Sequence, residues 1–169
     1  MRTLAVIGVL AIVIAVGAAV FFFGGYFNVA ASESNPGIVN WALVKVRMAS
    51  VGRRAGLASP VDLDSPDVVR AGARAFSERG CTNCHGAPGV QWQKFSEGLN
   101  PDPPDLKEIA PEREPAQLFW VVKNGIKMTG MPSFGAIGAD DTEIWSIVAF
   151  VRKLPNTSEA DFKAWSANP

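Results

Sequence analysis

The chain has 169 residues, enough for one domain of ordinary size and an additional segment. It carries 16 Lys and Arg residues against 16 Asp and Glu residues, so it lacks the basic excess expected of a nucleic-acid-binding protein. With 48% hydrophobic residues, it is too apolar for a disordered chain. Two cysteines and one histidine are too few for a four-ligand structural zinc site or a multi-disulfide scaffold.

The N-terminus contains a long apolar run. Residues 4–23 include no charged or strongly polar side chain, and a helix of this length rises roughly 30 Å, the thickness of a bilayer's hydrocarbon core. The run predicts a single transmembrane helix within an anchor at residues 1–27, with Tyr26 at the membrane interface. A cleavable signal peptide is the alternative, because residues 29–31 are small enough for a cleavage site, although the apolar run is long for a signal.

Residues 28–59 are predicted to form a linker and a basic connecting helix. Residues 30–36 are small and polar, whereas residues 38–57 mix apolar and basic side chains. Between residues 37 and 59 there is no acidic residue, and the basic residues are Lys45, Arg47, Arg53 and Arg54. Three interpretations stay open: the helix could lie on an anionic membrane surface, dock on a partner as part of a larger complex, or be a solvated connection.

Residues 60–169 are predicted to form a small all-α domain, with 11 basic and 15 acidic side chains. A helix is expected to start at residues 64–67, where a capping side chain, a proline and an acidic residue follow one another, and to stop at Gly80. Proline opens a second helix at residues 115–123, and Asp140 caps a third at about residues 143–153.

Two long segments between these helices are rich in glycine and proline and show no strand pattern. They cover residues 86–111 and 127–138, and both are predicted to be mostly loop. Long loops without secondary structure are uncommon in a compact domain. A large prosthetic group that the loops wrap would explain them.

The most specific motif is C-x-x-C-H, formed by Cys81, Thr82, Asn83, Cys84 and His85. Its spacing predicts covalent haem attachment, because two thiols on one helical turn can each form a thioether with a haem vinyl group while the next imidazole reaches the iron. A thioredoxin-like disulfide would need a βαβ context, and a zinc site would lack a fourth ligand. The motif therefore predicts one haem c bound through Cys81 and Cys84. Because such haem is attached outside the bacterial cytoplasm, the domain is expected in the periplasm, anchored to the inner membrane through residues 4–23.

Over residues 64–154 the chain resembles the class I monohaem c-type cytochromes in their membrane-anchored bacterial form. The resemblance is carried, in chain order, by Gly72 and Phe76 before C-x-x-C-H, the loop at 102–106, Asn124-Gly125-Ile126, Gly130-Met131-Pro132, and the helix residues 144–154. It implies a cytochrome c-like all-α fold that wraps one covalent haem. It also implies that Gly72 and Phe76 cross the last helix near Ile147 and Phe150.

The second axial ligand of the iron is expected to be a methionine. His85 is the only histidine, so ligation by two histidines of one chain is impossible, and a thioether suits low-spin haem iron. Met131 matches the family's ligand, with Met128 as the alternative. The resemblance further implies that the Pro104 carbonyl accepts a hydrogen bond from His85 and that Leu106 packs on the haem. Candidates for the pocket wall, or for ordinary core, are Phe119, Trp120, Ile126 and Phe134.

These features predict an electron-transfer protein rather than an enzyme. With both axial positions filled, the expected role is one-electron transfer at the periplasmic face between membrane-bound or periplasmic redox proteins, such as respiratory-chain or dehydrogenase partners. The alternative is a permanent cytochrome subunit of a larger membrane oxidoreductase, held through residues 38–57. A haem-based gas sensor would need a displaceable Met131, and a peroxidase would need a second acid–base residue beside an open site.

Overall fold

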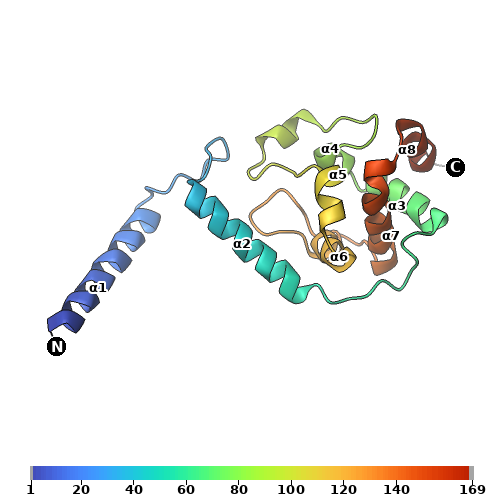
Figure 1. Cartoon of the computed structure of the whole chain (residues 1–169). Helices are drawn as coiled ribbons and strands as arrows, with labels where there is room; N and C mark the ends of the chain where they lie inside the picture. Colours follow the sequence, from blue (N-terminus) through green and yellow to red (C-terminus); the bar gives the residue numbers. More distant parts are fainter. Residues whose placement is uncertain (1, 168–169) are drawn as a thin grey trace. The chain divides into compact units, whose positions relative to one another are not determined.

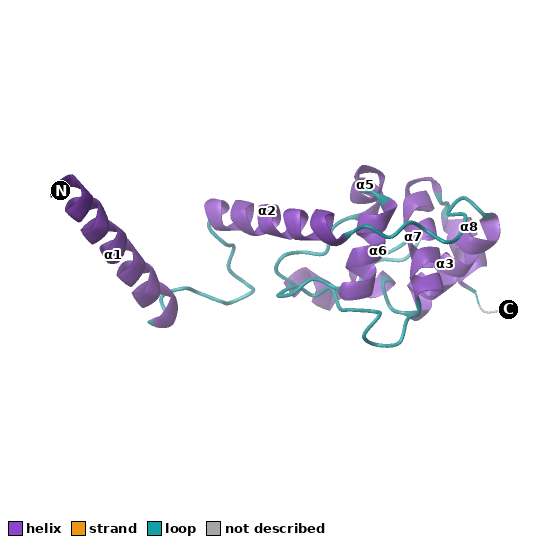
Figure 2. Cartoon of the chain, turned by 90° about the horizontal axis from the view of Figure 1, so that it is seen from below, coloured by secondary structure: helices purple, strands orange, loops and turns teal. Residues whose placement is uncertain are grey.

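The structure, a computed structural model, describes residues 2–167 and divides into two compact units, Met1–Ser34 and Asn35–Pro169. Its helices are α1 (Arg2–Phe23), α2 (Gly37–Arg54), α3 (Pro66–Glu78), α4 (Thr82–His85), η1 (Lys94–Gly98), α5 (Leu106–Ile109), η2 (Ala110–Glu112), α6 (Pro115–Asn124), α7 (Asp141–Lys153), η3 (Leu154–Asn156) and α8 (Glu159–Ser166). Figures 1 and 2 show that helices and loops make up the described chain, in which the only β pairing is an isolated bridge. The predicted all-α fold class is confirmed.

The first unit contains one helix, α1. It starts two residues before the apolar run and ends with it at Phe23. Among the described residues, it is the one helix long and apolar enough to cross a membrane, as judged by length and composition. All its described side chains are exposed, so its apolar surface is not covered within its own unit.

The core of the second unit is the crossing of α3 and α7, which meet at Gly72. A Cβ atom at Gly72 would overlap the carbonyl oxygen of Ser146 and lie 3.0 Å from the Cβ of Phe150. One turn further along α3, the ring of Phe76 packs edge-on against Phe150 with centroids 5.3 Å apart. The helices therefore touch through their backbones, and the crossing expected from the sequence is present.

The ends of these two helices are fixed by different means. Asp140 caps α7, because its carboxylate accepts a hydrogen bond from the backbone N–H of Glu143 at 2.8 Å. The start of α3 differs from the expectation: Ser65 makes no side-chain cap, and the neighbouring Asp64 forms an ion pair with Lys153 at the end of α7. The sequence pattern alone does not reveal this ion pair, because its partners lie far apart in the chain.

Helix α6 packs on the other side of α7. The rings of Phe119 and Trp145 stack with centroids 4.3 Å apart, and both side chains are buried. The C-terminal half of α2 contacts α6 and buries Val51. The helix α2 is shorter than the segment 38–57 in which the sequence predicts helical character, because it ends at Arg54.

The sequence interpretation missed the last helix, α8. Ser158 caps it by accepting a hydrogen bond from the backbone N–H of Asp161, a pairing close to a capping box. Phe162 is buried and stacks on Phe150 with centroids 5.6 Å apart. The signal that could have revealed this helix is the Ser158–Asp161 pair followed by Phe162 and Trp165 at helical spacing.

The replacement Gly72→Ala is expected to destabilise the protein by about 1–3 kcal/mol, because the new methyl group must push two packed backbones apart. The free energy of unfolding, measured by denaturant titration of the haem-loaded protein, tests this. Gly98→Ala is the matched control: nothing lies within 4 Å of a Cβ at Gly98, so its effect should stay within about 0.5 kcal/mol. Equal effects of the two replacements would contradict a close crossing at Gly72.

Candidate haem site

The C-x-x-C-H motif follows directly on α3. Gly80 has a φ of +73°, a conformation that ends the helix and that glycine adopts readily. The backbone N–H of Cys81 donates to the carbonyl of Phe76 at 3.0 Å, and that of His85 donates to the carbonyl of Cys81 at 3.0 Å. Cys81 and the single turn of α4 that follows it thus hold both thiols and the imidazole, and they are joined to the end of α3.

The chemistry of the two thiols fits covalent attachment better than metal binding. Cys81 is 8% exposed, and burial raises the pKa of its thiol to about 12, so it is not a thiolate at neutral pH. Cys81 and Cys84 are not joined by a disulfide. Among residues 2–167, no group of three or more His, Cys, Asp or Glu side chains is placed to hold a metal ion. The residues present therefore fit a haem group held by thioethers.

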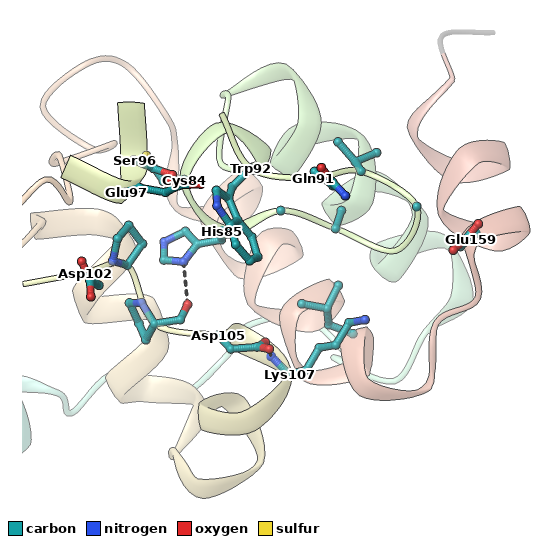
Figure 3. Close-up of a pocket in the computed structure, with 17 residues that line it drawn as sticks. Cys84, His85, Gln91, Trp92, Ser96, Glu97, Asp102, Asp105, Lys107 and Glu159 are labelled. Carbon is teal, nitrogen blue, oxygen red and sulfur yellow. Dashed lines mark hydrogen bonds between the residues drawn. The ribbon is translucent and has the colours of Figure 1, made fainter. Parts of the chain in front are cut away.

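The imidazole of His85 is oriented by a backbone carbonyl. Its Nδ1 lies 3.0 Å from the carbonyl oxygen of Pro104, as the dashed line in Figure 3 marks. Donation from Nδ1–H to this carbonyl leaves the lone pair of Nε2 free for a metal ion. Burial lowers the pKa of the imidazole, against the opposing effect of the Pro104 carbonyl. The ring is thus held in the neutral form that binds iron.

A cavity of about 750 Å³ lies beside Cys84 and His85. In Figure 3, Trp92 stands next to His85, Lys107 lies near Asp105, and Glu159 extends from α8. The charged side chains that line this cavity are Glu97, Asp102, Asp105, Lys107 and Glu159. Four carboxylates against one ammonium group give the cavity an acidic rim.

The loop that carries Met131 is folded against the end of α6. The backbone N–H of Ile126 donates to the carbonyl of Met131 at 3.1 Å, and the Thr129 hydroxyl donates to the carbonyl of Ile126 at 2.8 Å. Gly125 has a φ of +67°, and a Cβ there would lie 2.8 Å from the Met131 carbonyl oxygen and 2.7 Å from backbone atoms of the next two residues. Only glycine permits this close approach.

The two methionines of this loop have different surroundings. Met131 is half-buried and packs against the hydrophobic core. Met128 is 97% exposed and has a φ of +58°, so its side chain lies in solvent at the tip of the loop. This difference favours Met131 over Met128 as an iron ligand.

The structure brings some of the predicted site residues together. Cys84, His85 and Pro104 line the cavity, whereas Cys81, Leu106 and Met131 belong to or pack against the core without lining it. The four candidates for the pocket wall do not line the cavity either: Phe119 and Phe134 are buried, and Trp120 and Ile126 are half-buried.

The sequence interpretation missed several lining residues, among them Trp92, Lys107 and Glu159. These three come from separate segments, and no spacing pattern links them. A partial signal for the first exists, because Trp92 is an aromatic residue in a predicted loop close to C-x-x-C-H.

Comparison with known proteins agrees with this site. The family described as "Cytochrome C oxidase, cbb3-type, subunit III" matches residues 67–151, which include α3, the C-x-x-C-H motif, the Met131 loop and most of α7. Neither curated proteins nor solved structures give a match. The chain thus belongs to the cbb3-type cytochrome c oxidase subunit III family, and it is a c-type cytochrome.

Proposed function

We propose that this cytochrome is a membrane-anchored electron carrier with one haem c attached through Cys81 and Cys84 and ligated by His85 and Met131. The observation that carries the proposal is the His85 ring, which Pro104 holds with Nε2 free, on the same helical turn as both cysteines. Bound haem c supplies one-electron exchange between ferric and ferrous iron.

The roles of the surrounding residues follow from their contacts. Pro104 fixes the orientation and tautomer of the His85 ring, as hydrogen-bond acceptors commonly do for ligating histidines. Gly125 and Thr129 fix the backbone of the Met131 loop, which keeps the thioether close to the core. If His85 and Met131 both ligate the iron, they would leave no coordination site for a substrate or a gas, which supports a carrier over an enzyme or a sensor.

The proposed location is the periplasmic face of the bacterial inner membrane. The helix α1 is compatible with a single-pass anchor by length and composition. Haem c is attached outside the cytoplasm, which supports an orientation with the N-terminus inside. The acidic rim of the cavity favours redox partners with a basic docking face, whose binding would weaken as salt increases.

Met131→Ala is expected to give a high-spin haem that binds carbon monoxide readily and has a lower reduction potential, because the sulfur ligand is lost. Absorption spectra and a redox titration of the purified full-length protein measure these changes. Met128→Ala is the matched control: Met128 lies exposed in the same loop, so its replacement should leave the spectrum and the potential unchanged. The opposite pattern would assign the ligand to Met128 and contradict the proposal.

Gly125→Ala tests the positioning of the Met131 loop. The methyl group would collide with the backbone of that loop, so the weak far-red sulfur–iron band of the ferric protein should diminish and the potential should fall. Gly138→Ala is the matched control, because Gly138 also has a positive φ but nothing lies within 4 Å of its Cβ position. Gly138→Ala should cost about 1–2 kcal/mol of stability and keep the far-red band. Loss of the band in both variants would mean that general destabilisation, and not loop position, governs ligation.

A second candidate function is a permanent subunit of a larger membrane oxidoreductase complex. The family description favours it, because it names an oxidase subunit. The tagged full-length chain, extracted from its native membrane in mild detergent and washed at about 0.5 M salt, separates the two functions. A free carrier should elute as a single haem protein. Stoichiometric elution with other membrane subunits would contradict the free carrier and establish the subunit.

A further inference from the structure

The N-terminal half of α2 is apolar on all sides and largely uncovered. Residues 37–44 include one polar side chain, Asn40. The exposed apolar side chains are Ile38 (77%), Trp41 (62%), Leu43 (56%) and Val46 (67%). Because successive residues turn by about 100° around a helix, these four side chains point in widely different directions. A helix that is apolar all round is normally surrounded by apolar material, which the rest of its own compact unit does not provide here.

The C-terminal half of the same helix is attached to the haem domain, residues 60–169. Val51 is buried against this domain, and the Cβ position of Gly52 lies 3.8 Å from the side-chain amide of Gln117 in α6. Figures 1 and 2 both show the C-terminal end of α2 beside α6 and its N-terminal end directed away from α6. The helix is therefore held at one end and projects at the other.

Charge is also distributed along the helix rather than around it. The first eight residues carry no charge, whereas Lys45, Arg47, Arg53 and Arg54 follow in the second part, and no acidic residue lies between 37 and 59. An apolar part with a tryptophan beside a basic part suits an anionic bilayer surface, where the apolar part enters the interface and the basic part meets the headgroups. Each Lys or Arg near such a surface adds to the electrostatic attraction.

The short linker between α1 and α2 keeps α2 near the bilayer that would hold α1. The 13 residues from 24 to 36 join α1 to α2 and can span at most about 45 Å. A bilayer that holds α1 therefore keeps the start of α2 close to its surface at high effective concentration.

From these observations we infer that the N-terminal half of α2 inserts into the interface of the same bilayer, with its basic half on anionic headgroups. The inference rests on the proposed anchoring of α1. Since α2 is fixed to α6 at its other end, the insertion would restrict the orientation of the haem domain relative to the membrane. The same face of the domain would then be presented to every partner embedded in that membrane.

Site-directed spin labelling tests the inference on the full-length, haem-loaded protein in nanodiscs of phosphatidylcholine and anionic phosphatidylglycerol. A nitroxide on Leu43→Cys reports on α2, one on Val13→Cys on α1, and one on Ala160→Cys on an exposed position of α8; the native cysteines are consumed as thioethers. Collision rates with oxygen, which concentrates in lipid, are compared with those of a water-soluble nickel chelate. The Leu43 label should show a several-fold higher oxygen-to-nickel ratio than the Ala160 label, and this ratio should fall without phosphatidylglycerol.

A Leu43 label as accessible to nickel as the Ala160 label would overturn the inference, because α2 would then lie in water. A Leu43 label inaccessible to both reagents would also overturn it, since a protein surface would then cover α2. The Val13 label reports whether α1 itself lies in the bilayer, so it distinguishes a wrong position of α2 from a wrong anchor. If the Val13 label collided freely with nickel, the anchoring of α1 would be wrong and the inference would fail with it.

Discussion

The backbone contact between α3 and α7 at Gly72 is the constraint on which the rest of the haem domain depends. The end of α3 is bonded to Cys81 through the carbonyl of Phe76, so the position of α3 sets the position of the C-x-x-C-H turn. Helix α7 follows the Met131 loop and also holds α6 through the stacked rings of Phe119 and Trp145. The crossing therefore fixes, from one contact, the two segments that provide the proposed iron ligands. An ion pair between Arg79 and Glu143, with N–O distances of 2.6 and 2.7 Å, joins the same two helices near the motif.

Local signals in the sequence were sufficient for the main helices. Proline at the start of α3 and α6, the Asp140 cap of α7 and the positive-φ Gly80 each act on adjacent residues, so a reader of the sequence can find them. The side-chain cap expected at the start of α3 is absent, and the neighbouring Asp64 instead pairs with Lys153 at the end of α7. Such a long-range contact leaves no local pattern.

The same contrast between local signals and long-range contacts applies to the candidate haem site. The C-x-x-C-H motif is contiguous, and its proposed function as a haem-attachment turn can be read from five residues. The hydrogen bond from His85 to Pro104 spans 19 positions and followed only from the resemblance to a family. The cavity walls formed by Trp92, Lys107 and Glu159 could not be predicted, because tertiary folding alone brings these segments together.

Helices α1, α2 and α8 lie outside the residues that match the family. Helix α8 covers the core with Phe162 and extends Glu159 to the cavity, where the Cβ position of Gly89 is 3.2 Å from that side chain. Helices α1 and α2 supply the apolar and basic surfaces through which the protein would meet a membrane. In the proposed function, the matched core would carry the haem, and α1 and α2 would hold it at the membrane.

The most direct test of this account is the absorption spectrum of the detergent-solubilised wild-type protein, in ferric and ferrous forms, with and without carbon monoxide. The account predicts sharp c-type bands in the ferrous protein, a weak far-red sulfur–iron band in the ferric protein and no shift with carbon monoxide. A high-spin spectrum that shifts with carbon monoxide would show an open iron site and would contradict a carrier ligated by His85 and Met131.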